Sequence, residues 1–128
     1  MENISPEESL SRYIFSEKLY AKSPGRVKHA AFMPRENEAK ISIYRTSGLE
    51  EAKIWDIGKE IAVGRSHSVK GRAELMASCV LEKNLKVEPE EPPEHHANII
   101  FPSSEKSEQK LIAIQLAEEA QLRLLPVF

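Results

Sequence analysis

The sequence has little of what marks a secreted or membrane-spanning protein. Cys79 is the single cysteine, so no intramolecular disulfide can form, and a reducing compartment is expected. No apolar run approaches the roughly 20 residues that a helix needs to cross a bilayer. The amino-terminal stretch MENISPEE is acidic and lacks the apolar core of an export signal. We therefore expect a cytoplasmic protein without membrane contact.

Basic charge and aromatic side chains are also scarce. The formal net charge is -2, and aromatic residues make up 6% of the chain. Proteins that bind nucleic acids need a basic surface, often with aromatic side chains that stack on bases. The one basic segment, residues 64–72, contains no aromatic residue. Nucleic acid is therefore disfavoured as a partner.

The chain has enough apolar residues for one ordinary domain. Hydrophobic residues make up 41% of the sequence and charged residues 30%, which are common proportions for globular proteins. A chain of this length buries about two-thirds of its unfolded surface, so it needs neither a disulfide nor a metal to fold. We predict a single domain over residues 1–128, with no cofactor and no bound metal ion.

The strongest structural signal is a strand followed by a helix. Residues 41–45, ISIYR, alternate in polarity with the period of a half-buried strand. Ser47 and Glu50 have the spacing of a capping box, which indicates that a helix begins beside them. Isoleucines then recur at helical spacing. The predicted helix, 48–62, should bury Trp55 at the centre of the core, because truncating a buried tryptophan costs several kcal/mol.

Four further segments are rich in strand-forming residues. Residues 27–33 should pair with residues 40–45 in a hairpin, because the polar connection between them is short. The apolar run 73–81 favours a central strand with residues 85–87 as its hairpin partner. Residues 97–101 complete the predicted sheet.

The two ends of the chain decide how the sheet is covered. Residues 12–19 allow either a strand or a helix, since the window is too short to separate the two periods. Residues 104–124 predict the longest helix. The predicted class is α+β: a small antiparallel or mixed sheet of about five strands, with two main helices, 48–62 and 104–124, packed on one face.

Two neighbouring histidines form the sharpest chemical cluster. His95 and His96 follow Glu94, and imidazoles are general bases and metal ligands near neutral pH. Adjacent residues of an extended chain point to opposite faces, and no metal-ligand spacing accompanies these two. A polar loop end before a strand is the simpler interpretation.

A second cluster lies in the basic segment 64–72. Arg65, His67 and Arg72 stand there with two glycines, which would permit charge-assisted bonds to a phosphate. The spacing matches no Walker or dinucleotide loop, and a solvated loop is the simpler interpretation. If the two clusters meet, a composite site would contain Arg45, Arg65, His67, Arg72, His95 and His96. That site would belong to a small phosphate- or nucleotide-binding enzyme, with a histidine as the acid or base of phosphodiester chemistry.

The carboxyl end carries more apolar side chains than one helix face can bury. Those that lie off the main stripe of the helix or in the tail are Leu111, Ile114, Leu122, Leu125, Val127 and Phe128. Exposed apolar surface of this kind marks interaction sites. Because the chain has no catalytic motif, we expect a non-catalytic interaction module or accessory subunit that binds a protein partner or a second copy through this surface. Small bacterial immunity proteins, antitoxins and complex subunits offer an analogy in size and charge.

Overall fold

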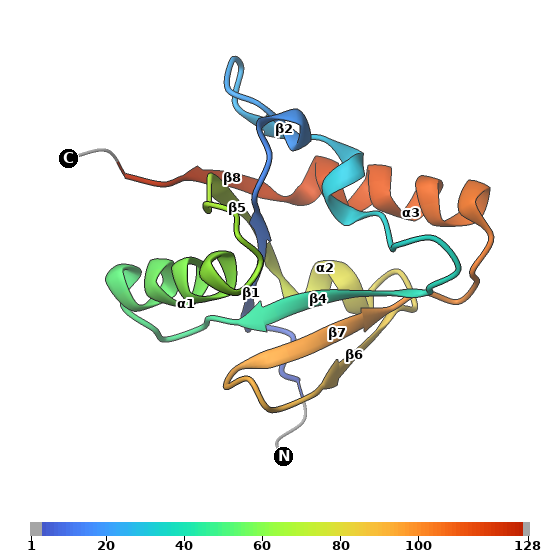
Figure 1. The fold of residues 1–128 in the computed structure, drawn as a ribbon. Helices are drawn as coiled ribbons and strands as arrows, with labels where there is room; N and C mark the ends of the chain where they lie inside the picture. Colours follow the sequence, from blue (N-terminus) through green and yellow to red (C-terminus); the bar gives the residue numbers. More distant parts are fainter. Residues whose placement is uncertain (1–3, 127–128) are drawn as a thin grey trace.

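A computed structural model describes residues 4–126 and shows an α+β fold built on a six-stranded sheet (Figure 1). Neighbouring strands pair antiparallel throughout, in the order β6-β7-β4-β1-β5-β8. The strands are β1 Ser9–Ile14, β4 Lys40–Arg45, β5 Gly71–Met76, β6 Lys86–Pro89, β7 His96–Ile100 and β8 Gln121–Leu124.

The helices are connected to this sheet by short segments. They are α1 Glu51–Gly64, α2 Ala77–Leu81 and α3 Lys106–Glu119, with two short 3-10 helices, η1 Glu17–Leu19 and η2 His29–Phe32. A separate two-residue ladder joins β2 Tyr20–Ala21 to β3 Arg26–Val27. None of the helices in residues 4–126 has the length and apolar character to cross a membrane.

Both faces of the sheet are covered, because side chains of β1 alternate between two cores. Leu10 and Ile14 belong to the larger apolar cluster, which includes Leu116 of α3. Tyr13 points to the opposite face and belongs to a smaller cluster with Trp55 of α1. The predicted α+β class is confirmed, but the two main helices lie on opposite faces and not on one. In Figure 1 they appear on either side of β1.

The sheet opens between two of its central strands. β1 pairs with β5 over six residue pairs, yet with β4 at only two, Leu10 with Arg45 and Ser11 with Tyr44. Beyond Ser11 the two strands separate, and Figure 1 shows β1 turning away from β4 toward β2. Backbone groups on the facing edges must then find other hydrogen-bond partners. This opening positions the candidate site.

The predicted hairpin of residues 27–33 with 40–45 is wrong. β4 pairs with β1 and β7, and the segment before it forms η2. Ala31 and Phe32 are both buried, and an extended strand would send two adjacent side chains to opposite faces. The 3-10 turn lets both contact the larger core beneath α3.

The predicted central strand 73–81 ends early. β5 stops at Met76, and residues Ala77–Leu81 turn into α2, which buries Ala77 and Val80 at helical spacing. Residues 85–87 also have a different partner, because β6 pairs with β7 and not with β5.

The two main helices differ from their predicted ends. α1 begins at Glu51 and ends at Gly64, and its N-cap Glu50 makes no side-chain cap bond, so the predicted capping box does not form. α3 ends at Glu119, and Gln121–Leu124 form β8 with alternating exposure. At the amino end, the strand alternative for residues 12–19 is correct in part, since β1 covers Ser9–Ile14.

Candidate anion-binding site

Arg72, a predicted ligand-binding residue, is enclosed in the fold. Its side chain lies on β5 and is 2% exposed, with Nη1 3.0 Å from a Glu51 oxygen and Nη2 3.2 Å from a Glu74 oxygen. The guanidinium lies 4.7 Å from the ring centroid of Trp55, a cation–π contact. Its hydrogen bond holds the pKa of Glu51 below the ordinary value. Arg72 therefore holds β5 to α1.

Arg45 is likewise engaged with a carboxylate. Its Nε and Nη2 each lie 2.8 Å from an oxygen of Glu8, the bidentate geometry that suits a guanidinium. This hydrogen-bonded pair holds the pKa of Glu8 below its usual value. Arg45 thus ties the segment before β1 to the end of β4.

The three predicted histidines have different surroundings. His96 is buried in β7, where its ring lies 5.3 Å from that of Tyr44 and its Nδ1 lies 2.8 Å from the Glu90 carbonyl oxygen. His95 has a φ of 72° and places Nε2 2.9 Å from a Glu94 oxygen. His67 is exposed after α1. Within residues 4–126, no group of three His, Cys, Asp or Glu side chains is placed to hold a metal ion.

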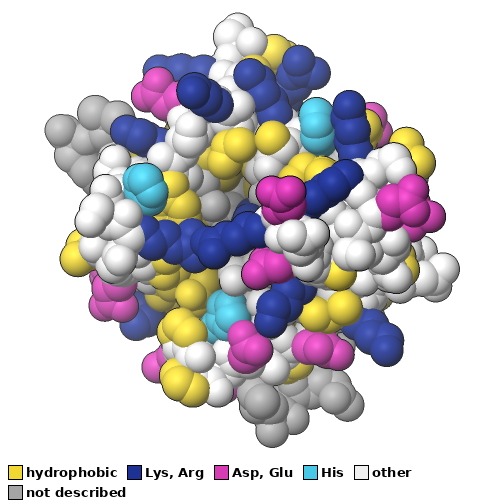
Figure 2. Space-filling view, turned by 45° about the vertical axis from the view of Figure 1, so that its right-hand side comes forward, with side chains coloured by type: hydrophobic (Ala, Val, Ile, Leu, Met, Phe, Trp, Pro, Cys, Tyr) yellow, Lys and Arg dark blue, Asp and Glu magenta, His cyan; other side chains and the backbone are white. Residues whose placement is uncertain are grey.

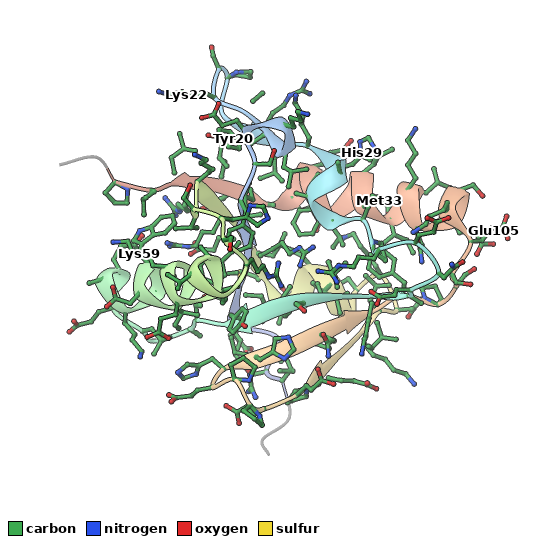
Figure 3. All side chains as sticks on the ribbon, in the orientation of Figure 1. Tyr20, Lys22, His29, Met33, Lys59 and Glu105 are labelled. Atoms are coloured by element: carbon green, nitrogen blue, oxygen red, sulfur yellow. The ribbon has the colours of Figure 1, made fainter. Side chains whose placement is uncertain are left out.

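Arg65 is the predicted residue that lies beside other cations. It lines a cavity of about 290 Å³ at the opening between β1 and β4. We call this the arginine cavity; its lining residues are Arg12, Met33, Arg35, Glu38, Lys40, Ile41, Ser42, Arg65, Glu90 and Asn98. Met33 is labelled in Figure 3, on the segment that leads from η2 to β4. Cations also gather on the surface, and Figure 2 shows Lys and Arg side chains crossing the middle of one face beside a hollow.

Arg12 bridges the opening in the sheet. Its Nη1 donates to the Ser42 carbonyl oxygen of β4 at 2.7 Å, and its Nε donates to the Ala31 carbonyl oxygen of η2 at 2.9 Å. The guanidinium thereby replaces part of the ladder that β1 and β4 no longer form, since buried carbonyl groups need donors. Both partners are neutral, so the positive charge of Arg12 is not compensated by them.

Two more guanidinium groups add to this uncompensated charge. Burial, and then the positive charges of Arg65 and Arg35, lower the pKa of Arg12 to about 10. No ion pair joins any of these three arginines to a carboxylate within residues 4–126. Arg65 instead lies 5.4 Å from the centroid of the Phe15 ring.

The cavity lining also contains two carboxylates, Glu38 and Glu90, which offset part of its positive charge. The Glu90 side chain is 3.7 Å from His96 Nδ1, and a hydrogen bond from Asn98, with the charges of Lys40 and His96, lowers its pKa. Glu38 is exposed and accepts through its backbone carbonyl from Gln109 at 2.8 Å. The lining contains no histidine and no cysteine. Four cations and two carboxylates therefore line the cavity, and this excess of positive charge suits an anion.

Sequence reasoning missed Arg12, Arg35 and Lys40 as members of this site. They are distant in sequence from Arg65, and no short motif links them. One local signal exists, because Arg12 lies between Leu10 and Ile14 on the same face of β1 and so occupies a core-facing position. A charged residue in an apolar stripe indicates a special role.

The predicted partner surface at the carboxyl end is only partly exposed. Leu111 is 65% exposed, and Ile114 lines a groove of about 580 Å³ between α3 and residues 26–30. His29, labelled in Figure 3, comes from the segment that forms the other wall of that groove. Leu122 packs against the larger cluster and Leu125 against the smaller one. Val127 and Phe128 lie outside the described residues.

Comparison with protein-family models, curated proteins and solved structures finds no match to this chain.

Proposed function

We propose that the protein binds a small phosphate-bearing molecule in the arginine cavity and does not cleave it. The observation that carries the proposal is the position of Arg12, held by two carbonyl groups at the opening of the sheet, beside Arg35 and Arg65 and without a carboxylate partner in residues 4–126. Such a site keeps an uncompensated positive charge until an anion binds.

A phosphate group suits this arrangement better than a single carboxylate. A phosphate monoester carries about -1.5 to -2 charges at neutral pH and three acceptor oxygens. Guanidinium groups present several donors in a planar fork and are favoured for phosphate recognition. Three arginines and Lys40, offset by Glu38 and Glu90, leave the lining with an excess of two positive charges, which matches a group of more than one negative charge.

The surroundings of the cavity support binding without catalysis. The enzyme alternative predicted from the sequence needs a histidine within hydrogen-bond reach of the reacting group. His96 is instead buried against Tyr44, and neither His67 nor His95 lines the arginine cavity. Arg65 is the part of the predicted composite site that the proposal retains.

A thermal and calorimetric experiment tests the proposal. Because a ligand that binds only the folded state stabilises it, inorganic phosphate at ten times its dissociation constant should add about 1.4 kcal/mol of stability, or about 4 °C in Tm. Chloride at matched ionic strength should not. Arg35→Ala and Arg65→Ala should each weaken phosphate binding about tenfold, the loss of one charge-assisted hydrogen bond.

The control is Arg26→Ala, which removes an exposed arginine that lies in β3 and outside the cavity. It should leave phosphate affinity unchanged. Equal affinities for the wild type and all three variants would overturn the proposal, as would an equal response to chloride.

The partner-binding role of the carboxyl end stays a prediction, and the exposure of Leu111 is the observation that favours it. Light scattering on the wild type and on Leu111→Glu tests the homo-oligomer form of this prediction. A dimer that the substitution converts to a monomer would support it, and a monomeric wild type would contradict it. We also propose a cytoplasmic location, because an unpaired Cys79 suits a reducing compartment.

A further inference from the structure

We infer that the ligand is a nucleoside monophosphate whose phosphate occupies the arginine cavity and whose base lies between α1 and the loop before β7. This inference rests on the proposed function and names the part of the ligand beyond the phosphate. It is carried by a second cavity beside Tyr44, which is related to the first through a small depression that shares lining residues with both.

A small depression lies between the two cavities and shares lining residues with both. Arg12, Ser42 and Arg65 line the arginine cavity and this depression, which has a volume of about 20 Å³. Tyr44 and Ile61 line the depression and a distal cavity of about 280 Å³. The three hollows therefore adjoin one another, so that one ligand lying across the depression would reach both cavities.

The distal cavity combines an apolar wall with a polar rim. Tyr44, Ile57 and Ile61 supply the wall, and the rim consists of Lys53, Glu60, Glu94 and His95, with Pro93 between. A flat heteroaromatic ring needs apolar contact on its faces and donors or acceptors at its edges. An acyl chain would leave the charged rim unused, and a sugar alone would leave the apolar wall uncovered.

The walls of this cavity are held in place before any ligand arrives. The Tyr44 ring lies 5.6 Å from the Tyr13 ring and 5.3 Å from the His96 ring. The backbone N–H of His95 donates to a Glu91 oxygen at 2.8 Å, and its Nε2 lies 2.9 Å from Glu94. Preorganised walls reduce the entropy that binding must overcome.

The order of the three hollows suits a mononucleotide. A cavity lined by cations and a cavity with an apolar wall lie on either side of the depression, as phosphate and base lie on either side of the pentose in a nucleoside monophosphate. The depression is too small to enclose a pentose, so the sugar would lie across it at the surface. The net charge of -2 opposes a long nucleic acid strand.

Calorimetry on the full chain tests this inference with three probes: adenosine monophosphate, ribose 5-phosphate and inorganic phosphate. The nucleotide should bind at least tenfold more tightly than ribose 5-phosphate, because only the nucleotide reaches the distal cavity. Ribose 5-phosphate should bind within about threefold of inorganic phosphate. The same panel repeated with guanosine, cytidine and uridine monophosphates shows which base the rim prefers.

Ile61→Trp is the decisive variant, because Ile61 lines both the depression and the distal cavity, and a larger side chain there would obstruct a ligand that lies across them. It should reduce nucleotide affinity to that of ribose 5-phosphate and leave inorganic phosphate binding unchanged. Val63→Trp is the matched control on the same helix, since Val63 is 79% exposed and lines none of the three cavities.

Lys53→Ala gives a second readout that does not depend on packing, because Lys53 is exposed on α1. It should weaken nucleotide binding about threefold to tenfold without an effect on inorganic phosphate. Lys59→Ala is its control, an exposed lysine of α1 outside the distal cavity, labelled in Figure 3.

The outcomes separate this inference from the proposed function. If inorganic phosphate binds through Arg35 and Arg65 but no nucleotide binds more tightly than ribose 5-phosphate, the inference fails and the proposed function stands. If neither phosphate nor nucleotide binds, both fail. A phosphorylated peptide that binds more tightly than every nucleotide would also overturn the inference.

Discussion

Two arginines on the same sheet, Arg72 and Arg12, have opposite electrostatic surroundings. Arg72 is 2% exposed in its side chain, stacks on Trp55 and has carboxylate oxygens of two residues within 3.2 Å. Arg12 donates to two carbonyl oxygens and has no carboxylate partner within residues 4–126. A buried guanidinium with paired charge serves the fold, whereas one held by neutral groups at a cavity retains charge for a ligand.

The same comparison supports the proposal that the arginine cavity binds an anion. Holding Arg12 near Arg35 and Arg65 opposes folding, because like charges repel in a partly desolvated setting. The two carboxylates of the lining, Glu38 and Glu90, form no ion pair with these arginines within residues 4–126. Such uncompensated charge is a cost that proteins carry where binding requires it.

The largest expected effect is on stability, from Arg72→Ala. Glu51 and Glu74 are 61% and 24% exposed in their side chains, so they stay solvated when Arg72 is removed. The loss of the charge-assisted bonds of Arg72 and of its contact with Trp55 should cost about 2–4 kcal/mol. We expect a loss in that range by urea denaturation. The folded fraction should keep its phosphate affinity, because Arg72 does not line the arginine cavity. If the folded variant no longer bound phosphate, Arg72 would also contribute to binding, and the two arginines would not differ in role.

The next effect is on binding, from Arg12→Lys. Lysine keeps the charge but cannot donate to Ser42 and Ala31 from one planar fork. We expect phosphate affinity to fall about 10- to 100-fold, equivalent to about 1.4–2.7 kcal/mol, measured by calorimetry. Arg123→Lys is the control, an exposed arginine on β8. Unchanged phosphate affinity in Arg12→Lys would mean that the hydrogen bonds from Arg12 to the carbonyl groups of Ser42 and Ala31 do not position a phosphate-binding group.

The strands and helices show which elements local sequence patterns can predict. The strand β4 was predictable because residues 41–45 alternate in polarity, and α1 because its isoleucines recur at helical spacing. β8 was missed, although Gln121–Leu124 alternate polar and apolar residues, because they continue an apolar helical stripe. Four residues are too few to distinguish the period of a strand from that of a helix. Pairing with β5 is what makes these residues a strand.

The candidate site was predictable in one residue only, Arg65. The cavity exists because β1 and β4 part after two residue pairs, and strand separation leaves no mark on either strand's sequence. Arg35 and Lys40 look like solvated charges of a polar connection. The one local sign was Arg12 in an apolar stripe, which becomes informative once residues 9–14 are known to be a strand.

The smallest expected effect concerns Arg45, which is paired with a carboxylate as Arg72 is but lies nearer the surface. Its carboxylate partner Glu8 has a folded pKa below the unfolded value, so the pair's contribution is fully present above the unfolded pKa of about 4.3. That contribution is lost as pH falls through the folded pKa.

Glu8→Gln should therefore cost about 1–2 kcal/mol at pH 7, in the range of a charge-assisted hydrogen-bonded pair. The difference between wild type and variant should shrink as the pH is lowered past the folded pKa, because both side chains are then neutral. Urea denaturation of the two proteins between pH 7 and pH 2.5 measures this. A stability difference that stays constant over that range would mean that Glu8 acts through packing, and charge compensation would then not distinguish the arginines of this sheet.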